Sequence, residues 1–223
     1  MRKVTLLFAA AAICCGLTVT AASAMPIAPV PTDPAAKIEQ VRWVCGPYGR
    51  CWWRPNYYRG YYGYAYYPRL LGWIDLTLRA HLGDAQTVIS RGFPRLPLYF
   101  SADTLTSAKV VLVDQLPIPP LSLWGLTRFA DFERGNFSGI KYLNTFFIKR
   151  DDARNEVIHF HELIHVIQWR ILGPEQFLRL YADGLERFGY RNSPLEKMAY
   201  DAEAAFTANE IFNAEEMVVR NLS

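Results

Sequence analysis

The segment His161-Glu162-Leu163-Ile164-His165 combines two imidazoles and a carboxylate within five consecutive residues. On a helix, residues four apart lie one turn apart on the same face, so both imidazoles can reach one metal ion. Glu162 follows the first histidine directly and can take a proton from a water molecule bound to that metal. The spacing therefore predicts a zinc site with a general base beside it.

The surrounding residues predict that this motif lies on a buried helix. The run Val157–Ile171 is apolar almost all round, which is typical of a helix inside a core. Asp151 and Asp152 offer N-cap oxygens, and Gly173-Pro174 supplies a stop signal. Buried histidines and glutamates need partners, and a metal would provide one. The alternative is a core helix whose histidines are satisfied by hydrogen bonds alone.

The other two histidines are weaker candidates for ligands. His159 precedes the motif by two residues and points to another face of the helix, so a structural role is expected. His81 is remote in sequence and ends an amphipathic stretch, so a surface position is expected. No histidine follows His165. A catalytic zinc usually has three protein ligands, and a downstream carboxylate is the better candidate for the third.

Two glutamates on a later predicted helix could supply that carboxylate. Ser193 is a candidate N-cap, with Pro194 at the first helical position. Glu196 and Glu203 are seven residues apart and share one face of this helix, so either could face the metal. Ser193 and Glu196 also fit a capping box, in which the glutamate would bond back to the N-cap amide instead.

Two sequence blocks, residues 161–168 and 191–200, resemble the zincin metallopeptidases. The similarity is nearest to the gluzincin-like branch and to bacterial peptidase-like domains of unassigned function. In those proteins a glutamate within Glu-x-x-Ala, on a later helix, completes the zinc site, and Glu196-Lys-Met-Ala199 matches that pattern. The resemblance implies that His161, His165 and Glu196 bind Zn²⁺ and that Glu162 is the catalytic base.

The chain departs from this family at one position. Several relatives have an aspartate after the alanine, where this chain has Tyr200. The carboxylate that would orient a zinc-bound histidine is therefore expected from Asp201 or Glu203 instead. The resemblance leaves Glu203 open as an alternative third ligand.

Three further residues are candidates for supporting roles around the site. Gln168 lies near the end of the motif helix and could orient a histidine or simply be polar filler. Tyr190 and Arg191 shortly precede the Glu196 helix and could stabilise an oxyanion, although ordinary loop packing is the alternative.

The N-terminus predicts export. Arg2 and Lys3 precede an apolar stretch from Val4 to Ala21, and Ala22-Ser23-Ala24 fits a cleavage site, so residues 1–24 are a predicted signal peptide. A periplasmic or secreted bacterial protein follows, with no stable membrane span after cleavage. Removal of two basic residues lowers the formal charge from +3 to +1, which gives no case for nucleic-acid binding.

Residues 25–69 predict a linker rather than a core. Residues 25–40 carry four prolines, and residues 41–69 are rich in Tyr, Trp, Gly and Arg. A disulfide between Cys45 and Cys51 is expected in an oxidising compartment. The segment 41–69 is either a basic-aromatic patch that contacts cell-envelope glycan, lipid headgroups or another protein, or a self-associating spacer.

Residues 70–223 have the composition of a globular domain. Their patterns predict an α+β fold with a small mixed sheet, the motif helix and further C-terminal helices, zincin-like in arrangement. The expected helices, besides the motif helix, are Trp73–Leu82, Glu175–Phe188 and Pro194–Asn213, and the expected strands are Leu96–Phe100, Lys109–Asp114 and Tyr142–Lys149. Asn144–Ile148 is either a sheet edge that pairs with an extended peptide or an ordinary core strand.

These observations predict a secreted zinc-dependent metallopeptidase that acts on a peptide or protein. The alternative is a cell-envelope binding or structural protein with a structural or vestigial metal site, in which residues 41–69 carry the function. Glu162 favours the enzyme, because a structural zinc site has no need of a base beside it.

Overall fold

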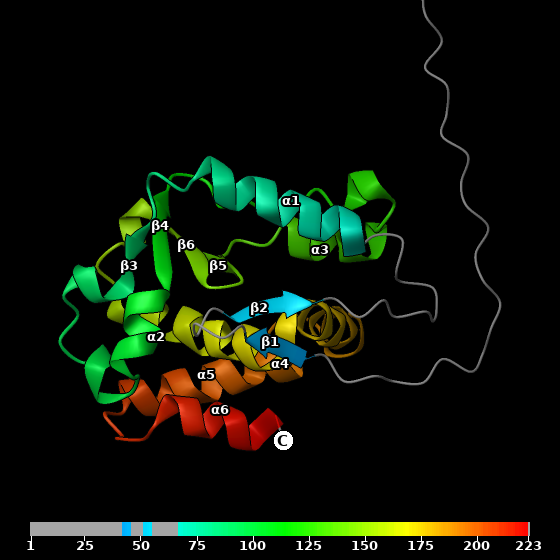
Figure 1. Cartoon of the computed structure of the whole chain (residues 1–223). Coiled ribbons are helices and arrows are strands. Elements are labelled where there is room, and N and C mark those ends of the chain that lie inside the picture. Colours follow the sequence, from blue (N-terminus) through cyan, green and yellow to red (C-terminus); the bar gives the residue numbers. More distant parts are fainter. Residues whose placement is uncertain (1–41, 46–50, 55–66, 223) are drawn as a thin grey trace, which may run out of the picture. The chain divides into compact units, whose positions relative to one another are not determined.

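The computed structural model describes residues 67–222 with their side chains, together with the backbone of 42–45 and 51–54 (Figure 1). The predicted signal peptide (1–24) and the proline-rich segment 25–40 lie outside these residues. Strand β1 (Arg42–Cys45) pairs antiparallel with β2 (Cys51–Arg54), and the register sets Cys45 opposite Cys51. The side chains of this hairpin lie outside the description, so the disulfide stays a prediction. Within the described part of the chain, no helix is both long and apolar enough to cross a membrane.

A four-stranded mixed sheet lies at the centre of residues 67–222. Its order is β3 (Gln86–Thr87), β4 (Lys109–Val113), β6 (Thr145–Lys149) and β5 (Gly139–Tyr142). β4 and β6 are parallel, and the two outer pairs are antiparallel. The structure therefore confirms an α+β domain with a small mixed sheet.

Helices supply the rest of this domain. They are α1 (Tyr67–Ala80), α2 (Ala102–Ser107), α3 (Ala130–Glu133), α4 (Glu156–Phe188), α5 (Pro194–Thr207) and α6 (Ala214–Leu222), with short 3-10 turns between several of them. α1 begins three residues before the predicted domain boundary at residue 70. α5 ends at Thr207, so the prediction of a helix that continues to Asn213 was wrong.

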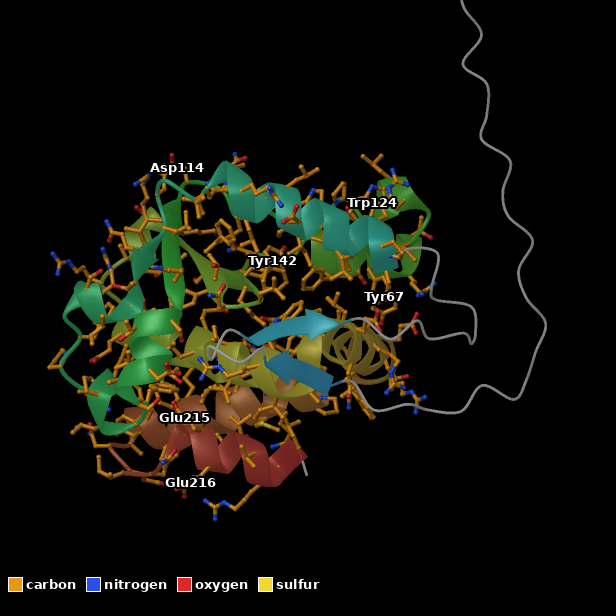
Figure 2. The ribbon with its side chains drawn as sticks, in the orientation of Figure 1. Tyr67, Asp114, Trp124, Tyr142, Glu215 and Glu216 are labelled. Carbon is orange, nitrogen blue, oxygen red and sulfur yellow. The ribbon has the colours of Figure 1, made fainter. Side chains whose placement is uncertain are left out.

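Helices cover both faces of the sheet. Alternate residues of a strand point to opposite faces, and on β6 Phe146 and Ile148 pack with α4, whereas Phe147 packs with Ile74 of α1. Figure 2 shows Tyr142 of β5 beneath α1, where its ring contacts Trp73 at a centroid distance of 5.5 Å. Burial on both faces explains why β4 and β6 are continuous apolar runs rather than alternating ones.

The central strand β6 corrects one of the two interpretations of Asn144–Ile148. β6 lies between β4 and β5, so it is a core strand and not a sheet edge. The strand at the outer end of the sheet on this side is β5, which precedes the predicted Tyr142–Lys149 strand and was not predicted. Leu143, at φ 57°, makes the turn between β5 and β6.

Two local predictions were wrong for identifiable reasons. Leu96–Leu98 forms a 3-10 turn instead of a strand, because Pro97 has no N–H for a sheet ladder. The N-cap of α4 is Asn155, whose side chain accepts a hydrogen bond from the Val157 amide at 3.2 Å. Asp151 and Asp152 instead form a separate 3-10 turn.

Gly173 bends α4 into two helical parts. Its backbone angles (φ 73°, ψ 164°) lie in a region that essentially only glycine adopts, and Pro174 follows. The predicted stop at Gly173-Pro174 is therefore a bend, and the predicted helix Glu175–Phe188 is the second part of α4. This bend turns Phe177 and Tyr181 back toward β5, where both rings contact Lys141.

Gly173→Ala should destabilise the protein by about 1–3 kcal/mol, because alanine is strained at these angles. Gly72→Ala, in the open middle of α1, is the matched control. No atom lies within 4 Å of its added Cβ, so it should stabilise by about 0.5–1 kcal/mol. Urea unfolding of both variants measures the two free energies, and equal effects would contradict the assignment of strain to Gly173.

Candidate metal centre

Three buried side chains converge at the packed face of α4 and α5. The Nε2 atoms of His161 and His165 are 3.1 Å apart. The Glu196 carboxylate contacts both, with Oε2 at 3.4 Å from His161 Nε2 and Oε1 at 3.2 Å from His165 Nε2. In a tetrahedral zinc site with Zn–N distances of ~2.0–2.1 Å, neighbouring ligand atoms are about 3.3 Å apart. The observed separations match that geometry.

The outer nitrogen of each histidine faces an acceptor. His161 Nδ1 lies 2.8 Å from Glu203 Oε2, and His165 Nδ1 lies 2.7 Å from Gln168 Oε1. The Gln168 amide is oriented by its own donor, since Nε2 donates to the Leu195 carbonyl at 3.0 Å. Both Nδ1 atoms therefore carry the proton, and these contacts orient the rings as partners of metal-bound histidines do.

This tautomer leaves lone pairs pointing at one another. A neutral imidazole protonated at Nδ1 has only an acceptor at Nε2, so two nitrogen lone pairs and the Glu196 oxygens meet at the centre. Oε2 of Glu196 is buried and has no hydrogen-bond partner among the described residues. Such a group of acceptors needs a positive charge at its centre. Burial acts against a charge on His161, but hydrogen bonds to Glu196 and Glu203 outweigh it and raise the pKa of His161 to about 9, so a proton on His161 can supply that charge. A metal ion, which fits the donor set of two imidazoles and one carboxylate, would replace this proton.

Glu196 does not form the predicted capping box. Ser193 has the extended backbone of an N-cap, but its side chain makes no cap hydrogen bond. The Glu196 carboxylate instead accepts a hydrogen bond of 2.6 Å from the Tyr181 hydroxyl, on the second part of α4. The bend at Gly173 thus helps to fix the direction of this carboxylate.

Glu162 lies beside the group formed by His161, His165 and Glu196. It is 5% exposed, and its Oε2 atom is buried without a hydrogen-bond partner in the described structure. β5 approaches it so closely that a Cβ on Gly139 would lie 2.5 Å from Glu162 Oε1. A cavity of about 20 Å³ is lined by Glu162, His165 and Glu196 together with aromatic residues. This volume holds one water molecule.

Gly139→Ala should displace the Glu162 carboxylate, because the added methyl group would occupy its place. If the centre hydrolyses a substrate with Glu162 as its base, the metal should stay bound and the catalytic rate should fall at least about tenfold. Gly83→Ala, where no atom lies within 4 Å of the added Cβ, is the control. Metal analysis and steady-state kinetics measure both, and full activity of Gly139→Ala would refute the close approach.

Burial and neighbouring charges shift the acidity of these groups in opposite directions. Burial raises the pKa of Glu162 to about 7, which suits a group that takes and returns protons near neutral pH. Burial lowers the pKa of His165 to about 4. Burial also acts against the charge on Glu196, but His165 and His161 outweigh it and hold the Glu196 pKa well below its usual range. Glu196 is thus a carboxylate, as a metal ligand must be.

Lys141 of β5 is a buried amine beside this centre, and sequence reasoning missed it. Burial lowers the pKa of Lys141 to about 8, although Glu196 and Glu162 act in the opposite direction. In the antiparallel register Lys141 lies opposite Phe146 and Gly139 opposite Ile148, so both face α4. The sequence offered one signal for this role, a glycine and a lysine two residues apart. That the segment carrying them packs against the motif helix could not be predicted from the sequence.

The structure places the remaining candidates as follows. Glu203 bonds to the outer face of His161 and not to the centre, so it supplies the orienting carboxylate, whereas Asp201 pairs with Lys197 on the surface. Tyr190 lines the small cavity. Arg191 is exposed and does not line this cavity; its guanidinium stacks over Tyr200 at 4.4 Å, and the Tyr200 ring in turn contacts His161.

The two other histidines are not part of the centre. His159 is fully buried, with Nδ1 at 3.0 Å from the Asn155 carbonyl and its ring against Phe93 and Phe146. His81 lies at the end of α1, half-buried, with its ring against Phe147. Neither can contribute to the metal group.

Comparisons with known proteins identify no relative. No protein-family model matches the chain, and neither the curated proteins nor the solved structures contain a match. The geometry of the centre and the residues around it therefore carry the functional argument.

Proposed function

We propose that this protein is an exported zinc-dependent peptidase. The observation that carries the proposal is the convergence of His161, His165 and Glu196 on one point, with Glu162 beside it in a cavity of one water molecule. The resemblance of the sequence to zincin metallopeptidases supports the same reading. His161, His165 and Glu196 would hold the metal, and Glu203 and Gln168 would orient the two imidazoles.

The chemistry divides between the metal and Glu162. When bound, zinc supplies an acidified water and polarises a carbonyl group. Glu162 accepts the proton of the attacking water and returns it to the leaving amine, and its raised pKa suits both transfers. Tyr190 lines the same cavity, and we assign its hydroxyl as the donor to the carbonyl oxygen as negative charge develops there.

A peptide needs more room than the cavity offers. Phe132 of α3 and Phe137, on the segment between α3 and β5, line it together with Tyr190, and the ring centres of Phe137 and Tyr190 are 4.7 Å apart. Substrate binding therefore requires this segment to move outward. The exclusion of bulk water in the closed form would strengthen the electrostatic interactions within the site.

The test is metal content combined with hydrolysis by the mature protein. Elemental analysis should find about one zinc per chain, removed by a chelator and restored by added zinc. Hydrolysis of an unstructured protein such as casein should disappear and return with the metal. A folded protein that binds no zinc at neutral pH, or cleavage that a chelator does not affect, would refute the proposal.

A further inference from the structure

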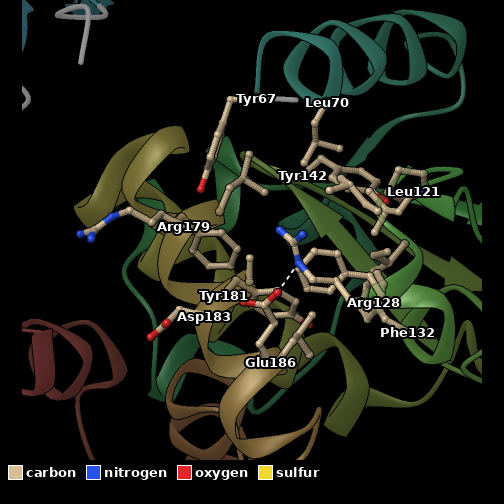
Figure 3. Close-up of a pocket in the computed structure, with 18 of the residues that line it drawn as sticks. Tyr67, Leu70, Leu121, Arg128, Phe132, Tyr142, Arg179, Tyr181, Asp183 and Glu186 are labelled. Atoms are coloured by element: carbon tan, nitrogen blue, oxygen red, sulfur yellow. Dashed lines mark ion pairs between the residues drawn. The ribbon is translucent and has the colours of Figure 1, made fainter. Parts of the chain in front are cut away.

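A second, larger cavity adjoins the metal centre. It has a volume of about 330 Å³ and lies between α1, the loop that carries Leu121 and Leu126, β5 and the second part of α4 (Figure 3). Phe132, Ile140, Lys141 and Tyr181 line both this pocket and the small cavity at Glu162. The two spaces are therefore neighbours that share a wall.

The pocket is apolar inside and polar at its rim. Its wall is formed largely by aliphatic and aromatic side chains, among them Leu70, Leu121, Leu126, Phe129, Tyr142 and Phe177. Figure 3 shows Arg128 and Glu186 extending toward each other, and they form a partly exposed ion pair. This combination of an apolar interior and few polar groups is typical of a site for a small organic ligand.

One positive charge lies in the apolar wall. The Lys141 side chain is 93% buried, and its Nζ atom is 4.9 Å from the ring centre of Phe177 and 5.0 Å from that of Tyr181. Among the described residues no acceptor forms a hydrogen bond or ion pair with this ammonium group. The carboxylates of Glu196 and Glu162 attract this ammonium group through space, but neither forms a hydrogen bond with it, so burying its three N–H donors still has a cost. The two rings offset only part of that cost.

We propose that this pocket binds a carboxylate with an apolar body, its negative charge paired with Lys141 and its body against the aromatic wall. Two sources share this chemistry: the C-terminal residue of a peptide with a large apolar side chain, and a free amphipathic acid. A single lysine matches the single charge of a carboxylate. The binding site rests on the pocket alone, and only a peptide as its source rests on the proposed peptidase function.

Calorimetric titration of the full-length, zinc-loaded Glu162→Gln protein tests this site without turnover. The ligands are Ala-Ala-Phe with a free carboxylate, the same peptide as its amide, decanoate and decanol. We expect at least one acid to bind at least tenfold more tightly than its neutral counterpart. Tighter binding of the peptide acid identifies a peptide C-terminus as the ligand, and tighter binding of decanoate identifies a free acid.

Two substitutions separate the charge from the pocket. Lys141→Met should abolish the preference for the acid and leave the affinity of the neutral ligand unchanged. Ala182→Phe adds a large side chain that fills the pocket from α4. It should reduce the binding affinity of every ligand at least tenfold. Leu123→Phe is the control, because Leu123 is 84% exposed and lies outside the pocket wall.

Three results would overturn the proposal. They are equal affinity of acid and neutral ligand, no measurable binding of any of them, and binding that Ala182→Phe leaves unchanged. Zinc content and circular dichroism of each variant establish that it is folded. Casein hydrolysis by the wild-type protein is measured separately, so a failed pocket and a failed peptidase assignment give different results.

Discussion

Glu162→Gln is expected to abolish most hydrolysis and to leave the zinc in place. The carboxylate lies beside the metal ligands and contacts none of the atoms that would bind the metal, so the amide should preserve metal binding. General base catalysis contributes about 10²–10⁴-fold to a rate, and the catalytic rate should fall by that factor. Zinc content per chain and the rate of casein cleavage are the two measurements.

Glu175→Gln is the matched control for this variant, since it lies on α4 outside the cavity and removes the same charge. The rate of casein cleavage by Glu175→Gln should equal that of the wild type.

The Glu162→Gln experiment also separates the two functions that the sequence allowed. A cell-envelope binding protein with a structural metal would be indifferent to Glu162→Gln, and unchanged envelope binding with no cleavage by either protein would favour that reading.

Glu196→Gln is expected to cause the largest loss of zinc affinity. Glutamine keeps the shape of the side chain and can still accept the hydrogen bond from Tyr181, but it removes the negative charge from the centre. We expect an affinity loss well above the ~10–100-fold that follows removal of a residue orienting a ligand. Glu203→Gln, which changes only the partner of His161 Nδ1, should show that smaller loss.

Thermal unfolding gives an independent readout of the same series. A metal at 100 times its dissociation constant stabilises a folded protein by about 2.7 kcal/mol, so added zinc should raise the melting temperature of the wild type. The rise should be smaller for Glu203→Gln and absent for Glu196→Gln, with Glu210→Gln, an exposed glutamate, unchanged from the wild type. A larger effect of Glu203→Gln than of Glu196→Gln would reverse the assigned roles of the two glutamates.

The elements that carry strong local signals were predictable. The motif helix follows from its apolar residues, and β4 follows from a run of valines whose burial on both faces favours a strand. β5 has no such signal, because Gly139 and Lys141 are not typical strand residues. Its strand conformation comes from pairing with its hairpin neighbour β6 and from packing against α4, and the packing against α4 is a long-range contact.

The residues that could bind a metal and accept a proton were identifiable from the sequence alone. The spacing of His161 and His165 places both imidazoles on one helix face, and the separation of seven positions from Glu196 to Glu203 places both carboxylates on one face of another helix. Which atoms each of these side chains contacts depends on how the two helices pack. Because α5 packs along α4, Glu196 in its first turn reaches both Nε2 atoms, whereas Glu203 two turns later reaches the opposite side of the His161 ring. The distance between the facing sides of α4 and α5 depends on how the two helices pack, so it cannot be predicted from the local sequence pattern of either helix.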